Sequence, residues 1–556
     1  MLAALLSCAA ALSLRAPHLR RTPTAHMCAA DSAEIDWREM RARLIASQGF
    51  ESPTRDESKQ GYIYESPLIE QGTILLGGTE MEFGFALRQQ FFHKCVLLLL
   101  QHDAHFTKGI ILNRPSAITQ DGWRLWCGHG QVAEGGIFIG EEQAMGELEI
   151  NCLHSLDSPM ADRLSTRVIK GVSCTSLEGA KELVAAGEAQ RSDFYVCAGY
   201  SGWAPGQLQM EVETRDSWFL ASADSATLLS ELLRQAKQLP PPSTEPPPTA
   251  DAADAAASEL LGTGTWATLM RGIGRESEAL NAEGTLADRM LHAWVRAHLL
   301  PKPPRPAPAT APVGVEAGTV LCSSVAADTG MPAERCLLRD QFLHKALLLV
   351  LQVAEDGTCT ACVLNRPTAS TMEFRLGGTP RRRVGFTGDR EIGGQLWLYH
   401  QGGGDDVDAA VTAGCVPLGQ SGIARLAGAQ VATMLQSKVV DVSQLLLVSH
   451  VVQFSPSELE SMVSAGEMRL LPSGDRLTRL WPRVWALGED CGDVGDGTEV
   501  WWLASQGGGS SGGGLGGGAE QVEEAGAGAA VVAAPPCELA DEALAEWLQY
   551  FAMPSS

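Results

Sequence analysis

A run of twelve residues that the chain contains in two versions is the strongest constraint on its fold. FFHKCVLLLLQH begins at Phe91, and QFLHKALLLVLQ begins at Gln341. Four further segments recur in the same order and at nearly the same spacing: GTILL as GTVLC, ILNRP as VLNRP, GWAPGQL as QFSPSEL, and LADRMLHAW as LADEALAEW. A shared order at an almost constant offset predicts a tandem duplication of one domain.

The boundaries of the two copies follow from stretches rich in proline or glycine. Proline favours extended backbone and glycine gives flexible spacers, so we assign these stretches no regular structure. The expected order is a presequence at 1–30, a first domain at 31–300 with a Pro-rich insertion at 239–258, a Pro-rich linker at 301–313, and a second, degenerate domain at 314–556 with a Gly-rich segment at 507–535.

Each copy contains segments typical of strands and of helices. The apolar runs CVLLLLQ and ALLLVLQ predict buried central strands. GIILNRP and ACVLNRP predict second strands that stop at a proline, which lacks the N–H that a β-ladder needs. EGAKELVAAGE, AGAQVATMLQSK, PGQLQMEV and PSELESMV predict helices, and DWREMRARLIA predicts an amphipathic helix before the first copy. The expected fold class is α+β, with a mixed β-sheet flanked by helices in each domain.

The charge and hydropathy of the chain argue against two classes of partner. A formal net charge of −24 repels phosphate backbones, so direct nucleic-acid binding is not expected. Beyond the presequence no apolar stretch reaches 18 residues, so no membrane-spanning helix is expected.

The first thirty residues have the composition of a targeting segment. They contain Arg15, Arg20 and Arg21, are rich in alanine, and precede the first acidic residue, Asp31. The apolar opening also resembles the core of a signal peptide. We expect a plastid (chloroplast) transit peptide and a stromal location, with the mitochondrion and the secretory pathway as alternatives.

The fourteen cysteines are scattered, which argues against a disulfide scaffold. Cys359 and Cys362 form a C-T-A-C sequence that runs into a predicted strand. Residues three apart on a strand point to opposite faces, so two buried structural cysteines are favoured over a redox pair. A thiol-based redox module, with Cys95 or Cys197 as further thiols, stays open as an alternative.

Two short motifs that recur in both copies carry residues capable of chemistry. His93 and Lys94 stand where the buried strand begins, so we expect their side chains to point to opposite faces. The histidine could transfer protons near neutral pH and the lysine could bind an anion, or both could pair internally. Asn113 can close the backbone through its amide, and Arg114 can bind a carboxylate or phosphate or form an internal salt bridge.

The segment GYSGWAPGQL combines three glycines with two aromatic residues. Glycines allow close backbone approach, and a turn that leads into a helix can present N–H groups to an anion. The segment lacks the spacing of a phosphate-binding loop. A tightly packed turn around a core tryptophan therefore explains it as well as an anion-binding turn does. The candidate binding residues here are Gly199, Tyr200, Gly202, Trp203, Gly206 and Gln207.

The second copy keeps the first two motifs as His344, Lys345, Asn365 and Arg366 but replaces every glycine of the turn. The two copies are therefore not equivalent, and the first is the better candidate for activity. We expect the second to serve as a built-in partner, so that the two domains pair within one chain as subunits of a homodimer do.

HKCVLLLLQH, GIILNRP and CAGYSGWAPGQLQMEV together resemble the AlgH/YqgE family, an uncharacterised protein family. DWREMRARL, TWATLM and LADRMLHAW resemble its plastid-type members. The resemblance extends over residues 36–300 and, more weakly, over 318–553. It implies a compact α+β domain with a large mixed sheet and no established catalytic activity.

The function expected is non-enzymatic binding of a protein partner or a small ligand through the first domain. A regulatory role is one form that this function could take. Standard catalytic and zinc motifs are absent from the sequence, and no cofactor or metal is expected. The alternative is a hydrolase or transferase that uses His93 or Lys94, Arg114 and the turn from Gly199 to Gln207. That alternative requires these residues to line one pocket.

Overall fold

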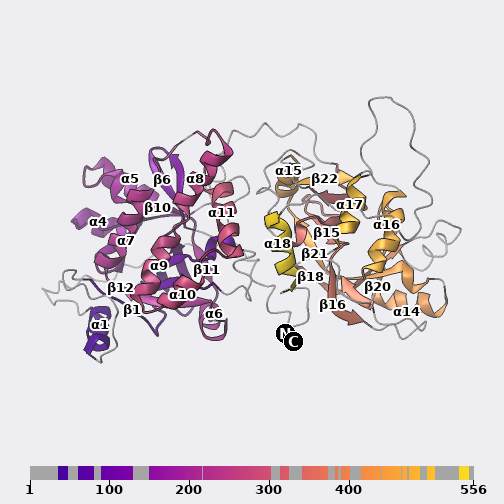
Figure 1. Cartoon of the computed structure of the whole chain (residues 1–556), viewed down its shortest axis with the longest axis horizontal. Coiled ribbons are helices and arrows are strands. Elements are labelled where there is room, and N and C mark those ends of the chain that lie inside the picture. Colours follow the sequence, from indigo (N-terminus) through magenta and orange to yellow (C-terminus); the bar gives the residue numbers. More distant parts are fainter. Residues whose placement is uncertain are drawn as a thin grey trace. The chain divides into compact units, whose positions relative to one another are not determined.

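In a computed structural model the chain forms two compact units. Each unit combines helices with antiparallel or mixed sheets, which confirms the α+β class (Figure 1). The structure describes residues 36–47, 61–79, 89–128, 149–215, 217–243, 245–301, 314–324, 341–372, 382–385, 388, 390–400, 415–438, 440–464, 466–471, 475–488, 497–506 and 538–549.

The first unit contains an antiparallel sheet with the strand order β1-β12-β2-β3-β4-β11. Its centre is β3, the run VLLLLQH, whose side chains alternate between two apolar cores, as the period of a strand requires. The strands are β1 (Ile63–Glu65), β2 (Ile74–Gly77), β3 (Val96–His102), β4 (Thr107–Ile111), β11 (Ser201–Trp203) and β12 (Trp218–Ala223).

A second sheet of the first unit has the order β5-β6-β10-β7-β9-β8 and is mixed, because β10 runs parallel to β6. The expected single mixed sheet is therefore two sheets. The strands are β5 (Pro115–Gln120), β6 (Trp123–Cys127), β7 (Ile150–His154), β8 (Ser165–Ile169), β9 (Val172–Ser176) and β10 (Tyr195–Ala198).

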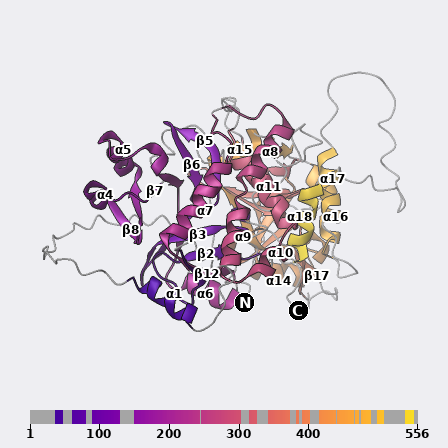
Figure 2. The same ribbon diagram turned by 60° about the vertical axis from the view of Figure 1, so that its left-hand side comes forward.

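Helices cover both sheets of the first unit. Side chains from α7 and α9 pack on one face of the antiparallel sheet, and side chains from α6, α8 and α11 pack on the other. Helices α4 and α5 lie beside β7 and β8 of the mixed sheet (Figure 2). The helices are α1 (Trp37–Ser47), α4 (Pro159–Leu164), α5 (Leu177–Ala185), α6 (Gln207–Arg215), α7 (Ser225–Gln238), α8 (Ala250–Leu260), α9 (Thr263–Gly272), α10 (Glu276–Asn281) and α11 (Leu286–His298), with the 3₁₀ turns η4 (Gln90–Phe92) and η5 (Arg191–Asp193).

Both sequence motifs of the first unit lie where the chain crosses from one sheet to the other. The chain leaves β4, passes through Asn113 and Arg114, and enters the mixed sheet at β5. It returns from β10 through Gly199 and Tyr200 into β11. The expectation that Pro115 ends a strand is wrong, because it opens β5, an edge strand on which a missing N–H is tolerated.

The second unit has one eight-stranded sheet, in the order β19-β20-β18-β21-β15-β14-β13-β22, and the pair β16-β17. Its elements are β13 (Val320–Ser323), η7 (Gln341–Leu343), β14 (Leu347–Val353), β15 (Cys359–Val363), β16 (Pro367–Met372), β17 (Arg382–Gly385), β18 (Arg390–His400), β19 (Val416–Pro417), β20 (Ile423–Ala427), α14 (Gly428–Gln436), η8 (Val442–Gln444), β21 (Leu445–Phe454), α15 (Pro456–Ser464), β22 (Met468–Leu471), α16 (Asp475–Ala486), α17 (Thr498–Gln506) and α18 (Glu538–Trp547).

The second unit has a continuous strand where the first unit has its glycine-rich turn. In the first unit Gly199, with a φ of 76°, interrupts the chain between β10 and β11. In the second unit the corresponding segment is the continuous strand β21, which pairs with β18 along its first part and with β15 at its end. One uninterrupted strand thus joins strands that the first unit keeps in separate sheets. The sheet of the second unit is antiparallel rather than mixed.

Part of the predicted insertion at 239–258 has regular structure. Most of α8 lies within it, and α8 packs against α11, whereas the described residues between 239 and 249 form no helix. The presequence, almost all of the linker and the Gly-rich segment lie outside the described residues. Among the described helices none is both long and apolar enough to cross a membrane.

Candidate functional site

The residues His93 and Lys94 converge on one carboxylate instead of pointing to opposite faces. They precede β3, and Lys94 takes a left-handed backbone conformation with a φ of 51°. This turn brings His93 Nε2 to 2.8 Å and Lys94 Nζ to 2.7 Å from the same Oδ1 atom of Asp288. The expectation of opposite faces was wrong because it applied strand alternation to residues that lie in a turn.

The Asp288 carboxylate accepts hydrogen bonds from both His93 and Lys94 and so offsets the cost of burying these two side chains. Burial lowers the pKa of His93, so the imidazole is neutral at pH 7 and donates from Nε2, while Nδ1 has no hydrogen-bond partner among the described residues. Burial raises the pKa of Asp288, but the hydrogen bonds from His93 and Lys94 outweigh it and lower the pKa to about 2. Asp288 also completes a capping box with Thr285 at the start of α11.

Asn113 closes the backbone through its side chain, as the sequence predicts. Its Oδ1 accepts from the N–H of Val96 at 2.7 Å, and its Nδ2 donates to the carbonyls of Lys94 and Gly262, both at 2.9 Å. A Cβ atom at Gly262 would lie 1.9 Å from the Asn113 carbonyl oxygen, so this position requires glycine. Asn113 therefore joins three segments of the chain.

Arg114 is buried and serves the backbone. Nη1 donates to the carbonyls of Asn113 at 3.0 Å and Leu261 at 2.8 Å, and Nη2 donates to the carbonyl of His93. Burial lowers its pKa to about 10, which leaves the guanidinium charged at neutral pH. In the described structure the side chain thus forms neither the ligand site nor the internal salt bridge considered from the sequence.

The second unit repeats these contacts. His344 Nε2 and Lys345 Nζ lie 2.9 and 2.6 Å from Asp541 Oδ1, and Lys345 has a φ of 49°. Asn365 accepts from the N–H of Leu347 and donates to the carbonyls of Lys345 and Gly497. Arg366 donates to the carbonyls of Asn365, His344 and Phe342. We call the set His93, Lys94, Asn113, Arg114 and Asp288 the first polar cluster, and the set His344, Lys345, Asn365, Arg366 and Asp541 the second polar cluster.

A buried tryptophan stands beside each lysine. Lys94 Nζ lies 5.7 Å from the ring centre of Trp266, and Lys345 Nζ lies 6.0 Å from that of Trp501. Each indole donates to a backbone carbonyl, of Gly77 at 3.0 Å and of Ser323 at 2.7 Å. The two clusters therefore share their packing as well as their hydrogen bonds.

The glycine-rich turn does not join the first polar cluster. Gly199 donates its N–H to the carbonyl of Glu149 at 2.8 Å, and Gly202 pairs with Lys108 in the sheet. Gly206, with a φ of 77°, is exposed just before α6. The Gln207 N–H donates to the Ala204 carbonyl at 3.1 Å. Part of the N-terminus of α6, which the sequence suggested as an anion site, is therefore already hydrogen-bonded within the protein.

Tyr200 occupies the surface side of the same turn. Lys108 Nζ lies 4.8 Å from the centre of its ring and forms an ion pair with Glu149. Phe106 meets the Tyr200 ring edge to face, with 6.2 Å between centroids. The ring is thus held by a cation–π contact and an aromatic contact within the unit.

Trp203 and Gln207 instead surround Glu211, a buried carboxylate on α6. The indoles of Trp203 and Trp218 donate to Glu211 Oε2 at 3.0 and 2.9 Å, and Gln207 Nε2 donates to Oε1 at 3.0 Å. We call these four residues the glutamate cluster. Its donors are neutral, so hydrogen bonds from dipoles compensate the burial of the carboxylate.

The second unit replaces the glutamate cluster as a set. Phe454 pairs with Cys359 as Trp203 pairs with Thr107, and Met468 pairs with Ser323 as Trp218 pairs with Gly77. Met462 follows a buried leucine of α15 by three residues, as Glu211 does on α6. All three replacements are buried and apolar. Acceptor and donors were lost together, which leaves no buried partner unsatisfied.

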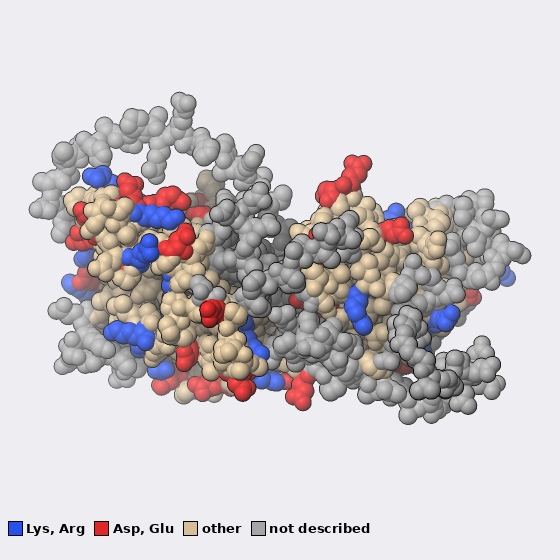
Figure 3. Space-filling view, turned by 90° about the horizontal axis from the view of Figure 1, so that it is seen from above, with Lys and Arg blue, Asp and Glu red and all other residues tan. Residues whose placement is uncertain are grey.

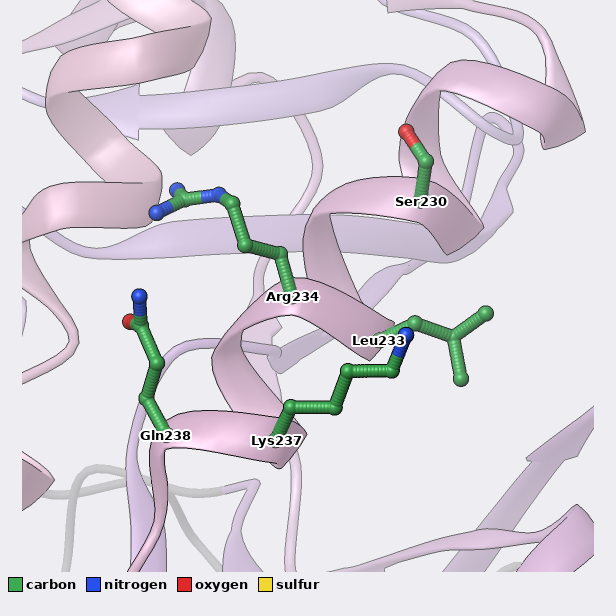
Figure 4. Close-up of a pocket in the computed structure, with 5 residues that line it drawn as sticks. All are labelled: Ser230, Leu233, Arg234, Lys237 and Gln238. Carbon is green, nitrogen blue, oxygen red and sulfur yellow. The ribbon is translucent and has the colours of Figure 1, made fainter.

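One pocket of the first unit lies beside α7 and involves neither cluster. Figure 4 shows its side chains spread outward from this single helix. Arg234 points toward α9 and hydrogen-bonds Thr268 at 3.2 Å. None of the candidate residues lines this pocket, and the first polar cluster and the glutamate cluster hold His93, Arg114 and Trp203 in separate networks. The pocket is lined by Ser230, Leu233, Arg234, Lys237 and Gln238.

Cys359 and Cys362 do not form a redox pair. Both lie on β15, where Cys359 belongs to one apolar core and Cys362 to another, so they face opposite sides of the sheet. Burial raises the pKa of Cys359 to about 11 and that of Cys362 to about 12, which disfavours the reactive thiolate. Cys95 is also buried, and burial raises its pKa to about 12; burial likewise raises the pKa of Cys197 well above its ordinary value.

Charge and ligand geometry offer no other centre in the described parts of the chain. No group of three or more His, Cys, Asp or Glu side chains there is arranged to hold a metal ion. Figure 3 shows acidic and basic side chains interspersed on the described parts of one face, without a continuous basic stripe.

Asp288 and Glu211 are the central acceptors that the sequence analysis missed. Both stand inside segments that had been singled out, Asp288 in LADRMLHAW and Glu211 in GQLQMEV. The aspartate of LADRMLHAW is also present in LADEALAEW, so the repeat within the sequence carried a signal for Asp288. Glu211 has no counterpart in the second copy that could have pointed to it.

Comparisons with known proteins agree with the sequence motifs. Residues 84–238 match the AlgH-like family, DUF179. A UPF0301 protein of Streptomyces avermitilis is 31% identical over 151 residues, 26% of this chain and 74% of the relative. A UPF0301 protein of Methylococcus capsulatus is 33% identical over 169 residues, 30% of this chain and 89% of the relative.

Two solved structures also match part of the chain. The AlgH protein of Pseudomonas aeruginosa is 19% identical, with a TM-score of 0.22, over 31% of this chain and 88% of that one. Protein DIP2367 of Corynebacterium diphtheriae is 20% identical, with a TM-score of 0.21, over 29% of this chain and 79% of that one. The two UPF0301 relatives are more than 30% identical to this chain, and the match covers most of their length. The chain therefore belongs to the AlgH-like UPF0301 family.

Proposed function

We propose that the protein is a non-enzymatic binding protein that engages a protein partner through α1 of its first unit. The observation that carries this proposal is the orientation of α1, which presents apolar side chains to solvent. Trp37, Met40 and Leu44 are 63%, 45% and 51% exposed. Their spacing of three and four residues places them along one face of the helix.

The polar face of α1 holds it to the rest of the unit. Arg38 Nε lies 3.3 Å from Glu70 and its guanidinium also bonds the Gln71 carbonyl, while Arg41 bonds Glu70 and the Tyr64 hydroxyl. Figure 1 shows α1 at the periphery of the unit, near β1 and β12. An amphipathic helix whose charged side faces the protein and whose apolar side faces water is typical of a protein-binding surface.

The burial of the polar clusters supports a non-catalytic role. A catalytic acid, base or nucleophile must reach its substrate, whereas the reactive groups of the first polar cluster are bound by one another and by backbone carbonyls. These residues are better explained as the means by which α9 and α11 are fixed to the sheet. The proposed partner-binding surface on α1 is therefore separate from the first polar cluster.

Two methionines with equal exposure give a matched test of this proposal. Met40 on α1 and Met210 on α6 are both 45% exposed, so replacing either with serine removes the same kind of surface. Wild type, M40S and M210S would be used to capture proteins from an extract of the source organism, followed by titration of the purified partner. We expect a partner that binds wild type and M210S and is lost with M40S. The same set of captured proteins for all three would contradict the proposal.

We also propose that the two units arose by duplication of one AlgH-like domain. The first and second polar clusters share the contacts of their histidine, lysine and asparagine residues, which supports this origin. The helix α1 belongs to the first unit, so we assign partner binding to that unit.

We further propose import into the plastid stroma, on the basis of the arginines and the missing acidic residues of positions 1–30. A fluorescent protein fused behind residues 1–60 tests this directly. Fluorescence in mitochondria or in the secretory pathway would contradict the proposal.

A further inference from the structure

The last described helix of the second unit, α18, has the features of a bound helical ligand. Four of its side chains are buried at the spacing i, i+3, i+4 and i+7, which is how an amphipathic helix anchors on a receiving surface. They are Ala540, Ala543, Leu544 and Trp547. Residues 507–537 separate α18 from α17, a length of chain that can span about 100 Å when extended.

The surface that receives α18 combines an apolar anchor with a charged one. Trp547 packs against Phe342, with 5.7 Å between ring centroids. Beside it, His344 and Lys345 bind Asp541 at 2.9 and 2.6 Å, and both are almost fully buried. Without a carboxylate in this place a buried ammonium would lose its counter-charge, so the surface selects a helix with an acidic residue six positions before a tryptophan.

The first unit provides the contrast. Its helix α11 makes the same contacts, with Asp288 bound by His93 and Lys94 and Trp294 lying 5.6 Å from Phe91. Only four residues separate α11 from α10, so α11 is fixed to its neighbours along the chain. The second unit keeps the recognition contacts but attaches the helix through a much longer connection.

We propose that the second unit is a helix-recognition site and that α18 is its exchangeable ligand, replaced in trans by the α18 of a second copy of the chain. The tether gives the chain's own helix a high effective concentration, so it occupies the site in dilute solution. At high concentration the helices exchange and form a two-fold symmetric, domain-swapped dimer.

Cleavage of the full chain tests whether α18 exchanges. A protease site placed between residues 513 and 519 allows α18 to be cut free after folding. A fluorescein-labelled peptide of residues 538–549 is then added, and its binding is followed by anisotropy, with near-ultraviolet circular dichroism as the check on the fold. We expect the peptide to bind the cleaved protein at least about tenfold more tightly than the uncut chain, whose own helix competes.

The peptide chemistry and the oligomeric state complete the test. A D541N peptide is expected to bind about tenfold more weakly or worse, whereas E542Q, the same charge change at an exposed position, binds like the parent peptide. Light scattering of the uncut chain at increasing concentration is expected to show a dimer that D541N removes. The proposal fails if cleavage gives no exchange, if D541N and E542Q peptides bind equally, or if the chain remains a monomer at every concentration.

Discussion

At the scale of single residues, Asp288 decides how much the first polar cluster contributes to stability. One oxygen of its carboxylate receives both His93 and Lys94, and the same side chain caps α11. The substitution D288N removes the charge but keeps the size of the side chain. Because it leaves the buried Lys94 without a counter-charge, we expect the free energy of unfolding to fall by about 3 kcal/mol. Urea denaturation measures this loss, and D254N, at a more exposed ion pair with Arg296, serves as the control.

The pKa of Asp288 also predicts how stability depends on pH. Its folded pKa is about 2, below the value near 3.9 of an aspartate in an unfolded chain. The contribution of this carboxylate is therefore complete above about pH 4 and is lost as the pH falls through about 2. We expect the difference in stability between wild type and D288N to shrink over that range. A difference that stays constant from pH 6 to pH 2 would show that Asp288 acts without its charge.

At the scale of elements, the glutamate cluster fixes α6 to β11 and β12. In E211M the indoles of Trp203 and Trp218 lose their acceptor, and we expect a loss of about 2 kcal/mol. The triple variant W203F/E211M/W218M installs the residues that the second unit carries at these places. Since it removes both indole donors together with their acceptor, we expect it to lose less stability than the sum of the losses of W203F, E211M and W218M. Thermal unfolding followed by circular dichroism compares the triple variant with the three single variants; losses that simply add would mean that the sites are not coupled.

The sequence predicted elements better than it predicted side-chain directions. Strand β3 and helix α6 follow from local patterns of apolar residues and from a proline before a helix, so they were found. The convergence of His93 and Lys94 depends on a left-handed backbone at a lysine, which no local pattern specifies. One carbonyl partner of Arg114, that of Leu261, comes from the loop before α9, far away in the chain, and only the folded structure brings the two residues together.

The division into two sheets was also beyond local reasoning. The motifs around Asn113 and Gly199 stood out in the sequence, but their role in crossing between sheets depends on strand pairing over long distances in the sequence. The second unit shows the alternative: where Gly199 is replaced, a continuous strand β21 runs through. The loss of Gly199 thus coincides with a change from two sheets to one large sheet.

At the scale of the whole molecule, the two polar clusters allow a test of whether the two units unfold independently of each other. Each cluster binds its own helix to its own sheet, α11 through Asp288 and α18 through Asp541. We expect D288N to speed hydrogen exchange in β3 without affecting β14, and D541N to do the reverse, because each substitution weakens contacts within one unit only. Mass spectrometry of peptides from the two strands measures both in one experiment, with E542Q as the control. If either substitution speeds exchange equally in β3 and β14, the units unfold as one cooperative body, and the idea that one chain contains two independent domains must be given up.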